Sequence, residues 1–473
     1  MSEDNKSKTS DALLSALRRI VGVATEPRVT RDDVNQAMIR HWCDAMTDHN
    51  PVYTDPAFAA ESVHGGIVAP PAMLDTWSMP GLAPRPRQES SSGEEAGMVP
   101  VLNQLDAAGF TSVVAAGMSH EYHRYLRPGD RLTISQVITS VSDEKQTALG
   151  VGHFFTTESN FADQQGNSVG RMEFTILKFK PGTGTVNMDA SALEGLEKMP
   201  RPRPAISRDT KFFWDGIDQG ELRIQKCDAC QGLHHPPVVR CPGCGSYELG
   251  YLVSQGRGTV YSFVEVHHPQ FPMFDYPLVG VLVELEEGTR IVSNLVGVKP
   301  EDVEIGMPVE LSIEATDPGL SLPLFRRARP ARRESTLLFA DLATGQKLPP
   351  CPVSISRTLI VAGAMASRDF QDVHHDPDLA KKRGSPDTFM NIMTTSGLTN
   401  RYVTDWAGPE VIFRKLSLRL GVPNFPGDTL TYTGQIQSTE LRDGKGVVEL
   451  LVTGTNNLGD HVTATVELEL PTR

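Results

Sequence analysis

A repeated pair of short motifs constrains this chain more than any other feature of its sequence. Asp48-His49-Asn50-Pro51-Val52-Tyr53 and Asp369-Phe370-Gln371-Asp372-Val373-His374 share a frame that opens with an aspartate. Each is followed, in the same order, by a Pro-Gly-Asp triplet, at 128–130 and at 426–428. The second copy is shorter by about the length of a Pro-, Ser- and Gly-rich loop predicted at 81–100. Two matched anchors in order predict two related domains in one chain.

Both copies show the same order of predicted elements, with helices before strands. In the first copy, helical patterns at 32–45 and 56–77 precede alternating strands at 131–141, 148–157 and 169–179. In the second copy, a helix near 389–402 precedes the strands. This order predicts an α+β fold for each repeat.

Between the repeats lies a block of different character. It follows a linker at 186–209 in which Pro alternates with Arg, and its short apolar runs at 258–267, 278–285, 289–296 and 308–315 are separated by Gly-containing turns. Short strands with such turns predict a small all-β barrel. A run of arginines at 326–333 is interpreted as a basic linker to the second repeat.

Four of the six cysteines open this middle block as two Cys-x-x-Cys pairs: Cys227 with Cys230, and Cys241 with Cys244. Each pair aims two sulfurs at one centre, and four thiolates form a tetrahedral site that suits Zn²⁺. Four sulfur ligands leave no open position for water, so the predicted role is structural, with iron in a rubredoxin-like site as the alternative. Cys43 and Cys351 are interpreted as ordinary buried or half-buried thiols.

Composition narrows the function classes. The 473 residues suffice for about three domains, and the net charge is −13 without a long basic tract, which argues against a nucleic-acid-binding protein. The sequence contains no run of about 18 apolar residues, so no membrane-spanning helix is predicted. The polar first ten residues lack the apolar core of a signal peptide, so a cytoplasmic location is expected.

Chemistry is expected in the second repeat. Adding water to a conjugated double bond needs a base for the water and an acid for carbon, and a carboxylate with a histidine can share these tasks. Asp369 and His374 can converge on one water if their loop curls before the following helix. In an isolated sequence, an Asp and a His at this spacing are more often plain surface residues. The repeat and the following helix favour catalysis.

This frame resembles the Asp-x-Asn-Pro-aliphatic-His signature of the R-specific, MaoC-type enoyl-CoA hydratases, which have hot-dog folds. The resemblance implies that Asp369 and His374 activate water and that Gln371 takes the supporting role of the family's Asn. In the first repeat Asp48 and Asn50 match, but Tyr53 replaces the His. A phenol with an ordinary pKa near 10 is a poor base at neutral pH, so this repeat is expected to be silent.

In the same family a glycine amide at the start of the central helix polarises the thioester carbonyl. The first repeat has Pro70 there, which has no N–H to donate. In the second repeat the amide of Met390 or of Asn391 is the candidate donor.

The cysteine block and barrel resemble a zinc ribbon with the OB-fold domain often found beside thiolases. The whole order resembles a fusion of the two subunits of the actinobacterial steroid side-chain enoyl-CoA hydratases. This resemblance implies five segments: a degenerate hot-dog domain at 1–185, a linker at 186–209, a helical lead-in and zinc ribbon at 210–250, an OB-fold domain at 251–328 and a catalytic hot-dog domain at 329–473.

That resemblance implies water addition to the 17(20) double bond of a steroid side-chain 2-enoyl-CoA, giving a 17-hydroxy acyl-CoA. Coenzyme A enters as part of the substrate, no redox cofactor is implied, and a thiolase-like aldolase docks on the OB-fold domain. A homodimer is expected. Two alternatives stay open from the sequence: a non-enzymatic acyl-CoA carrier or scaffold for a thiolase, and a hydratase of non-steroid acyl-CoA.

Overall fold

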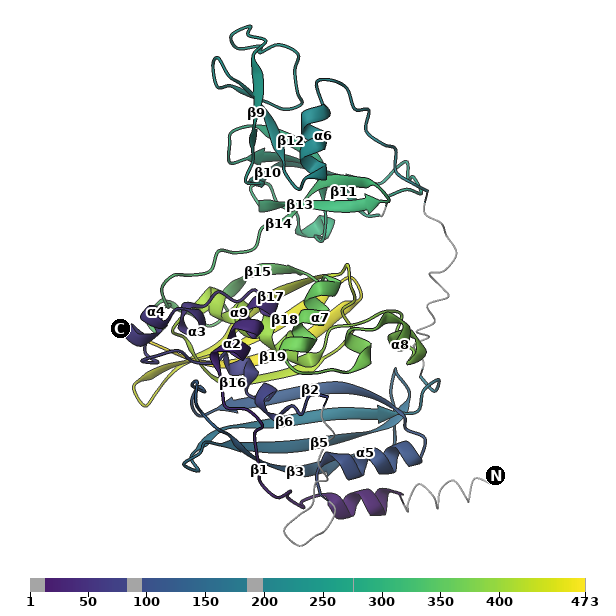
Figure 1. Ribbon diagram of the computed structural model, residues 1–473, viewed down its shortest axis with the longest axis vertical. Coiled ribbons are helices and arrows are strands. Elements are labelled where there is room, and N and C mark those ends of the chain that lie inside the picture. Colours follow the sequence, from purple (N-terminus) through teal and green to yellow (C-terminus); the bar gives the residue numbers. More distant parts are fainter. Residues whose placement is uncertain (1–12, 83–95, 185–198, 275, 473) are drawn as a thin grey trace. The chain divides into compact units, whose positions relative to one another are not determined.

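The computed structural model describes residues 13–82, 96–184, 199–274 and 276–472 (Figure 1). The chain divides into a unit built from Met1–Ala192 with Pro330–Arg473, here the hot-dog unit, and a middle unit, Leu193–Arg329. The loop predicted at 81–100 and the linker predicted at 186–209 lie partly outside the described residues. Met98 already begins a helix, so that loop ends earlier than predicted.

The N-terminal hot-dog has its helices before its main strands, as the sequence predicts. Its helical elements are α2 (Gln36–Met46), α3 (Pro51–Thr54), α4 (Pro56–Glu61), η1 (Pro71–Met73), η2 (Thr76–Ser78) and α5 (Met98–Ala107). Its strands are β1 (Arg28–Val29), β2 (Ser112–Tyr122), β3 (Thr133–Val141), β4 (Lys145–Gln146), β5 (Val151–Ala162) and β6 (Ser168–Phe179).

The C-terminal hot-dog repeats this plan with one long helix. Its helical elements are η5 (Phe339–Asp341), α7 (Arg357–Ala366), η6 (Asp372–His374), α8 (Pro377–Lys382) and α9 (Ile392–Ala407). Its strands are β15 (Lys347–Ser354), β16 (Ile412–Leu420), β17 (Thr429–Arg442), β18 (Lys445–Asn456) and β19 (Gly459–Leu470). Fifteen of the 16 residues of α9 are buried, so this helix is the core around which the sheet wraps.

One 11-stranded sheet joins the two hot-dogs, in the order β1-β3-β5-β6-β2-β16-β19-β18-β17-β15, with β4 paired to β5. The seam is the antiparallel pair β2 and β16, in which His120 lies opposite Leu416 (Figure 1). The hydroxyls of Ser119 and Ser417 meet across it at 2.5 Å. The pairing of two hot-dogs therefore occurs inside a single chain.

The Pro-Gly-Asp anchors make the same backbone hydrogen bonds in both hot-dogs. Gly129 donates to the carbonyl of Val34 at 2.8 Å, and Gly427 donates to that of Ile355 at 2.8 Å. Both glycines have positive φ values, 94° and 97°, which a side chain would strain. Each triplet thus fixes the segment that leads into α2 or α7, which explains why it accompanies the Asp motif in the sequence.

The central helix is where the two hot-dogs differ. The helical pattern predicted at 56–77 corresponds to α4 and to the short 3₁₀ turns η1 and η2, and not to one long helix. Pro70 and Pro71 stand where the long helix would begin, and Pro70 has no N–H to donate. In the C-terminal hot-dog, Gly397 lets α9 approach α2 closely, since a Cβ there would lie 2.8 Å from Trp42.

The middle unit contains a closed five-stranded barrel and a small three-stranded sheet. The barrel order is β10 (Arg257–Val266), β11 (Leu278–Leu285), β12 (Arg290–Leu295), β14 (Leu320–Arg327) and β13 (Pro308–Asp317). The small sheet is β8 (Leu233–His234), β7 (Arg223–Cys227) and β9 (Leu249–Val253), preceded by α6 (Lys211–Asp218). Interpreting Arg326 and Arg327 as linker was wrong: they end β14, which closes the barrel.

Candidate active site

The motif of the C-terminal hot-dog begins directly after α7, at a strained turn. Arg368 has a left-handed φ of 61°, which is uncommon for a residue with a side chain and is found preferentially at functional sites. The turn lets the amide of Asp369 donate to the carbonyl of Ala364 at 2.9 Å, and it directs the carboxylate inward, where Asp369 is 7% exposed. The backbone turn after α7 therefore sets the direction of the carboxylate independently of the side chains that contact it.

His374 faces this carboxylate with a defined ring orientation. Its Nδ1 lies 2.7 Å from the carbonyl oxygen of Phe389, which can only accept, so Nδ1 carries a proton. Its Nε2 lies 3.4 Å from Oδ2 of Asp369. Nε2 therefore faces the carboxylate whether it carries a proton, as in the charged ring, or a lone pair, as in the neutral ring, and one water could contact both groups. The structure thus brings the two predicted residues together.

Asn391 supports this pair through its side chain. Its Nδ2 donates to Oδ2 of Asp369 at 3.1 Å and to the hydroxyl of Ser367 at 3.0 Å, while its Oδ1 accepts from the amide of Thr394 and caps α9. Burial acts to raise the pKa of Asp369, but hydrogen bonds from His374 and Asn391 and from the Gln371 amide, with the His374 charge, hold that pKa below its ordinary value. Asp369 is therefore ionised at neutral pH.

The geometry redistributes the predicted supporting roles. Gln371 has an exposed side chain, and its contribution to Asp369 comes from its backbone amide. The amide of Met390 donates to the carbonyl of Asn424 at 3.1 Å, so it is already engaged. Among the described residues none accepts from the Asn391 amide, which lies at the N-terminus of α9. Of the two candidate amides, that of Asn391 fits better.

The matching residues of the N-terminal hot-dog form a closed copy that lacks the histidine. Thr47 has a left-handed φ of 52°, and the amide of Asp48 donates to the carbonyl of Cys43 at 2.8 Å, as in the other motif. Among the residues that the structure describes, no histidine pairs with Asp48; burial raises its pKa to about 6, although the Asn50 amide donates to it at 3.0 Å. Burial likewise raises the pKa of Tyr53 well above its ordinary value.

Asn50 explains why this copy is closed. Its side chain donates to the carbonyl of Pro409, in the C-terminal hot-dog, at 3.1 Å, and its Oδ1 caps α3. Asn50 and Tyr53 are each 1% exposed. The degenerate motif therefore serves as packing and capping between the hot-dogs.

Sequence reasoning missed the side-chain role of Asn391 and the participation of Ser367. Both residues lie outside the Asp-to-His frame, and Asn391 had been considered only for its amide. The one available signal was that an Asn before a helical run is a common N-cap, whose side chain turns back over the preceding loop.

The four cysteines of the middle unit form a second candidate site, for a metal ion. Their sulfurs all lie within 4.8 Å of one another, with Cys227 to Cys244 at 3.6 Å and Cys230 to Cys241 at 3.5 Å. A tetrahedral zinc with Zn–S bonds of about 2.3 Å requires similar sulfur separations, so the four residues fit the ion. The remaining thiols, Cys43 and Cys351, are buried, as predicted.

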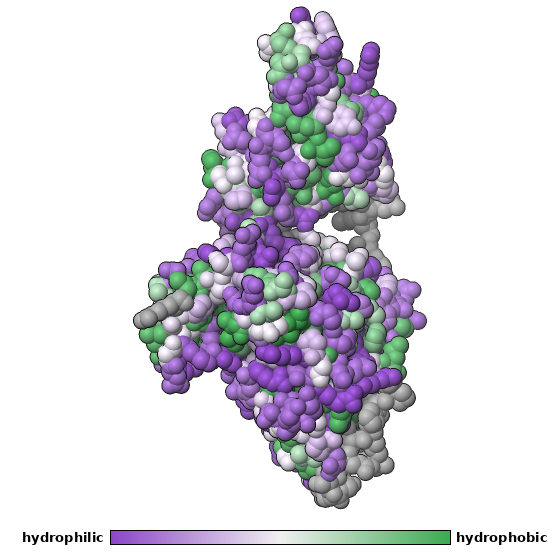
Figure 2. All heavy atoms as spheres, turned by 60° about the vertical axis from the view of Figure 1, so that its left-hand side comes forward, coloured by the Kyte–Doolittle hydropathy of each residue, from purple (hydrophilic) through white to green (hydrophobic). Residues whose placement is uncertain are grey.

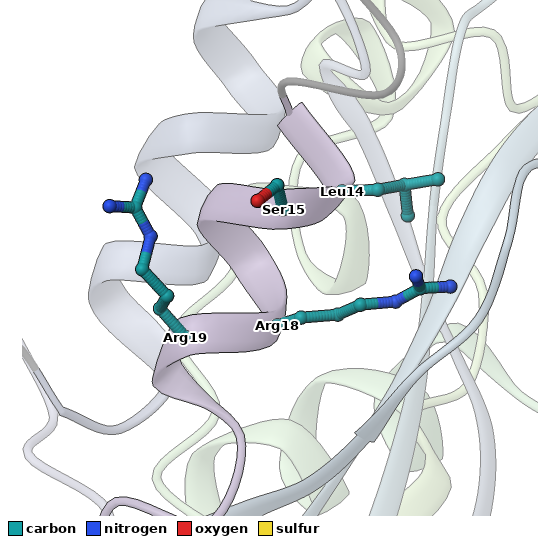
Figure 3. Close-up of a pocket in the computed structure, with 4 residues that line it drawn as sticks. All are labelled: Leu14, Ser15, Arg18 and Arg19. Carbon is teal, nitrogen blue, oxygen red and sulfur yellow. The ribbon is translucent and has the colours of Figure 1, made fainter.

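An open hollow on the surface is unrelated to either site. Figure 3 shows it on the helical turns at 13–20, lined by Leu14, Ser15, Arg18 and Arg19. Arg18 pairs there with Asp143 at 2.8 Å, and both side chains are largely exposed. None of the candidate catalytic or metal-binding residues lines this hollow, and we assign it no function.

Fold and site together define a double hot-dog protein with a MaoC-type acid–base pair, joined to a zinc ribbon and an OB-fold. Family models agree: a FAS1-like dehydratase domain region matches residues 19–172, and a MaoC-like domain matches 341–457. The ChsH2 rubredoxin-like zinc ribbon domain matches 214–250, and the ChsH2 C-terminal OB-fold domain matches 252–314.

Similar proteins carry hydratase names. The chain is 44% identical over 305 residues to a probable enoyl-CoA hydratase alpha subunit of Thermomonospora curvata, covering 64% of this chain and 93% of that protein. The chain is also similar to two Mycobacterium tuberculosis proteins. It is 44% identical to the 3-oxo-4,17-pregnadiene-20-carboxyl-CoA hydratase alpha subunit, over 60% of this chain and 88% of that protein. It is 51% identical to the beta subunit of the same hydratase, over 27% of this chain and 95% of that protein.

A solved structure of a MaoC-like dehydratase has the same fold, with a TM-score of 0.52 and 18% identity over 96% of this chain and 99% of that one. The chain belongs to the MaoC-like enoyl-CoA hydratase family. It is similar to both subunits of a hydratase that M. tuberculosis makes as two polypeptides. In the part of the chain that the structure describes, no helix is both long and apolar enough to cross a membrane.

Proposed function

We propose that the C-terminal hot-dog adds water to the 17(20) double bond of a steroid side-chain 2-enoyl-CoA, giving a 17-hydroxy acyl-CoA. The observation that carries this proposal is the buried pair of Asp369 and His374, with Nε2 and Oδ2 3.4 Å apart and aimed at each other. The substrate class comes from the two M. tuberculosis subunits, which are named for a pregnadiene carboxyl-CoA and to which this chain is similar. Coenzyme A enters as part of that substrate.

In this mechanism one water lies beside the pair and contacts both the Asp369 carboxylate and Nε2 of His374. The water oxygen bonds to the β carbon, one water proton is taken by the pair, and a proton returns to the α carbon, so that the elements of water are added overall. Asn391 holds the carboxylate in place, and its amide, at the N-terminus of α9, is the proposed donor to the thioester oxygen as negative charge develops there.

The N-terminal hot-dog is proposed to shape the acyl slot without doing chemistry. Tyr53 stands where the other hot-dog has His374, so this hot-dog lacks a carboxylate–imidazole pair, and η1 and η2 stand where its partner has the long helix α9. A large, rigid ring system needs more room than a linear acyl chain, and the absence of a second long central helix is consistent with such a substrate.

For the middle unit we propose a structural Zn²⁺ on the four cysteines and docking of a thiolase-like aldolase on the barrel. Tyr261, Val264 and Val292 are exposed apolar residues on β10 and β12, at 45%, 61% and 76%. Apolar side chains reach the surface of this unit in Figure 2, and apolar surface patches often mark protein interfaces. The ion stabilises the ribbon that precedes the barrel, and we propose that the whole chain forms a homodimer.

The deciding experiment is a hydration assay on the purified full chain. A steroid enoyl-CoA with a 17(20) double bond is compared with a crotonyl- to octenoyl-CoA series, and product is identified by mass. Turnover of the steroid substrate alone supports the proposal in full. Turnover of straight chains alone would retain the hydratase and overturn the steroid assignment, whereas no turnover of either would favour a non-enzymatic scaffold. Elemental analysis of the same sample is expected to give one zinc per chain.

A further inference from the structure

The N-terminal hot-dog buries three polar side chains that the proposed chemistry does not use. Asp75 follows η1, and His120 and Tyr122 lie on β2; they are 5%, 0% and 3% exposed. Oδ1 of Asp75, both ring nitrogens of His120 and the hydroxyl of Tyr122 have no hydrogen-bond partner among the described residues. Nε2 of His120 and Oδ1 of Asp75 are 3.9 Å apart, too far for a direct hydrogen bond. The rings of His120 and Tyr122 stack at 5.6 Å.

These three residues, here the polar cluster, lie beside the catalytic loop of the other hot-dog. Strand β2, which carries His120 and Tyr122, pairs with β16 at the seam, and α9 packs against both β2 and η1. A Cβ on Gly81, just after η2, would lie 3.3 Å from the ring of Phe370 in the catalytic motif. The negative charge of Asp369 also acts on Asp75. Helix α9, whose N-terminal residue Asn391 donates a hydrogen bond to the Asp369 carboxylate, therefore contacts the elements that carry the cluster.

A buried polar atom without a partner costs free energy, because it has lost its hydrogen bonds to water and gained none in return. Several such atoms gathered at one place are hard to explain by packing, because an apolar residue of the same shape would cost less. The cluster is therefore suited to an external polar atom. The ordinary alternative, water held by these groups, is decided by the test below.

We propose that Asp75, His120 and Tyr122 form a subsite that binds an oxo oxygen carried on the ring system of the acyl group. This inference rests on the proposed function, and it assigns the recognition of one substrate oxygen to the catalytically silent hot-dog. A tyrosine hydroxyl donates to a ketone oxygen, and His120 can supply a second N–H at fixed orientation. Aromatic rings around the oxygen pack against the flat ring system that bears it.

The charge state of the cluster favours an uncharged acceptor. Burial raises the pKa of Asp75 to about 7, so a large fraction of this carboxyl is protonated at neutral pH and can donate a hydrogen bond. Burial lowers the pKa of His120 to about 3, so the ring is neutral. A neutral imidazole, a phenol and a carboxyl that is largely protonated suit a ketone better than a phosphate or a carboxylate.

The test compares two enoyl-CoA substrates with the same ring skeleton, one bearing the oxo group and one without it. Tyr122→Phe removes a single buried oxygen and keeps the ring. We expect the ratio of kcat/KM for the oxo substrate to kcat/KM for the deoxo substrate to fall about 10- to 100-fold. His120→Gln is the second variant. It shortens the group while keeping a donor and an acceptor, and it is expected to lower the same ratio.

His153→Gln is the matched control. His153 is also a fully buried histidine of this sheet, on β5, with its Nε2 unpaired, but its ring packs on Phe110 and its Nδ1 lies 2.9 Å from the carbonyl oxygen of Ser142. Its substitution is expected to leave the ratio unchanged. General damage to folding or to the chemical step lowers turnover of both substrates by one factor, which the ratio cancels.

The outcomes separate this inference from the function on which it rests. Wild-type enzyme that hydrates neither substrate would overturn the proposed function itself. Wild-type enzyme that hydrates both with equal efficiency, or variants of Tyr122 and His120 that leave the ratio unchanged, would overturn only the subsite and would mean that the cluster holds water. A ratio that falls in both variants and not in the control supports it.

Discussion

The two hot-dogs use one backbone template to bury an aspartate at the same position, yet the pKa values of the two aspartates are shifted in opposite directions. In each, a non-glycine residue with left-handed φ, Thr47 or Arg368, ends a helix and directs the following aspartate inward. The pKa of Asp48 is raised to about 6 by burial, whereas that of Asp369 is held below its ordinary value by its hydrogen-bond donors. The template positions a carboxylate; its burial and the groups facing it determine the direction in which its pKa is shifted.

The same comparison separates two roles of the residues in the shared motif, which are to build the loop and to serve catalysis. The N-terminal copy keeps Asn50, which caps α3 and donates to Pro409, and keeps the local caps, with Asp55 accepting from two amides as Asp376 does in the other copy. What it has lost is the imidazole and the long central helix. The N-terminal copy thus contains the residues that build the loop without those that are proposed to serve catalysis.

The largest expected difference is between matched substitutions of the two aspartates. Asp369→Asn keeps the shape but removes the negative charge, and we expect kcat for enoyl-CoA hydration to fall by about 10³-fold or more. Asp48→Asn, its structural counterpart, is expected to leave kcat within about threefold, since Asp48 lies in the hot-dog that has Tyr53 in place of the catalytic histidine. Steady-state hydration kinetics on both variants give the answer, and equal losses would show that both hot-dogs take part in chemistry.

The next comparison exchanges the residues at the end of the frame. His374→Tyr reproduces the N-terminal motif in the C-terminal hot-dog and is expected to lower kcat by about 10²- to 10³-fold, because a phenol is a poor base at neutral pH. Tyr53→His is expected to give no second active site, since Asp48 would remain buried beside Asn50 and without an equivalent of Asn391. The double variant, assayed for hydration, tests this: recovered activity would contradict the view that the N-terminal pocket is closed.

Much of this arrangement could be predicted from the sequence, because it depends on short-range signals. The Asp-to-His frame, the Pro-Gly-Asp turns and the two Cys-x-x-Cys pairs each fix local geometry within a few residues. The barrel strands were predicted from the Gly-containing turns between them, and the predicted bounds of β11, Leu278–Leu285, are those of the structure. Strand β14 was missed because its arginines, Arg326 and Arg327, suggested a tether; both are only partly buried at the end of the barrel wall.

The rest depended on contacts between distant segments. Asn391 lies 22 residues beyond Asp369 and reaches it only because α9 begins beside the catalytic loop. The engagement of the Met390 amide by Asn424 is set by the packing of another loop. The polar cluster joins residues 45 positions apart through the sheet, and no local pattern marks Asp75 or His120 as partners. Such pairings become visible only when the fold is known.

Substitution of Asn391 tests which of its contacts matters. Asn391→Ser retains a residue that can cap α9, but its shorter side chain cannot bridge to Asp369. We expect kcat to fall about tenfold, and because the lost hydrogen bond had lowered the pKa of Asp369, the acidic limb of the pH–rate profile should move to higher pH. Asn50→Ser is the control in the N-terminal hot-dog and should leave the profile in place. An unshifted limb for Asn391→Ser would show that this contact is only structural.

The smallest effect concerns stability, and it has opposite signs in the two hot-dogs. The folded pKa of Asp48, about 6, lies above its ordinary 3.8, so folded protein retains a proton that the unfolded chain releases as pH rises between these values. The Asp48 carboxyl therefore destabilises the fold to its full extent above pH 6 and has no such effect below pH 3.8. Asp48→Asn should stabilise the hot-dog unit by on the order of 1–3 kcal/mol at pH 8 and by less at pH 4.5.

The pKa of Asp369 is depressed, so its stabilising contribution is present above pH 3.8 and is lost only as pH falls through its folded value. Asp369→Asn should thus destabilise the unit at both pH 4.5 and pH 8. Urea unfolding followed by tryptophan fluorescence at the two pH values measures both, and a pH-independent gain for Asp48→Asn would contradict the raised pKa on which the contrast between the two carboxylates depends.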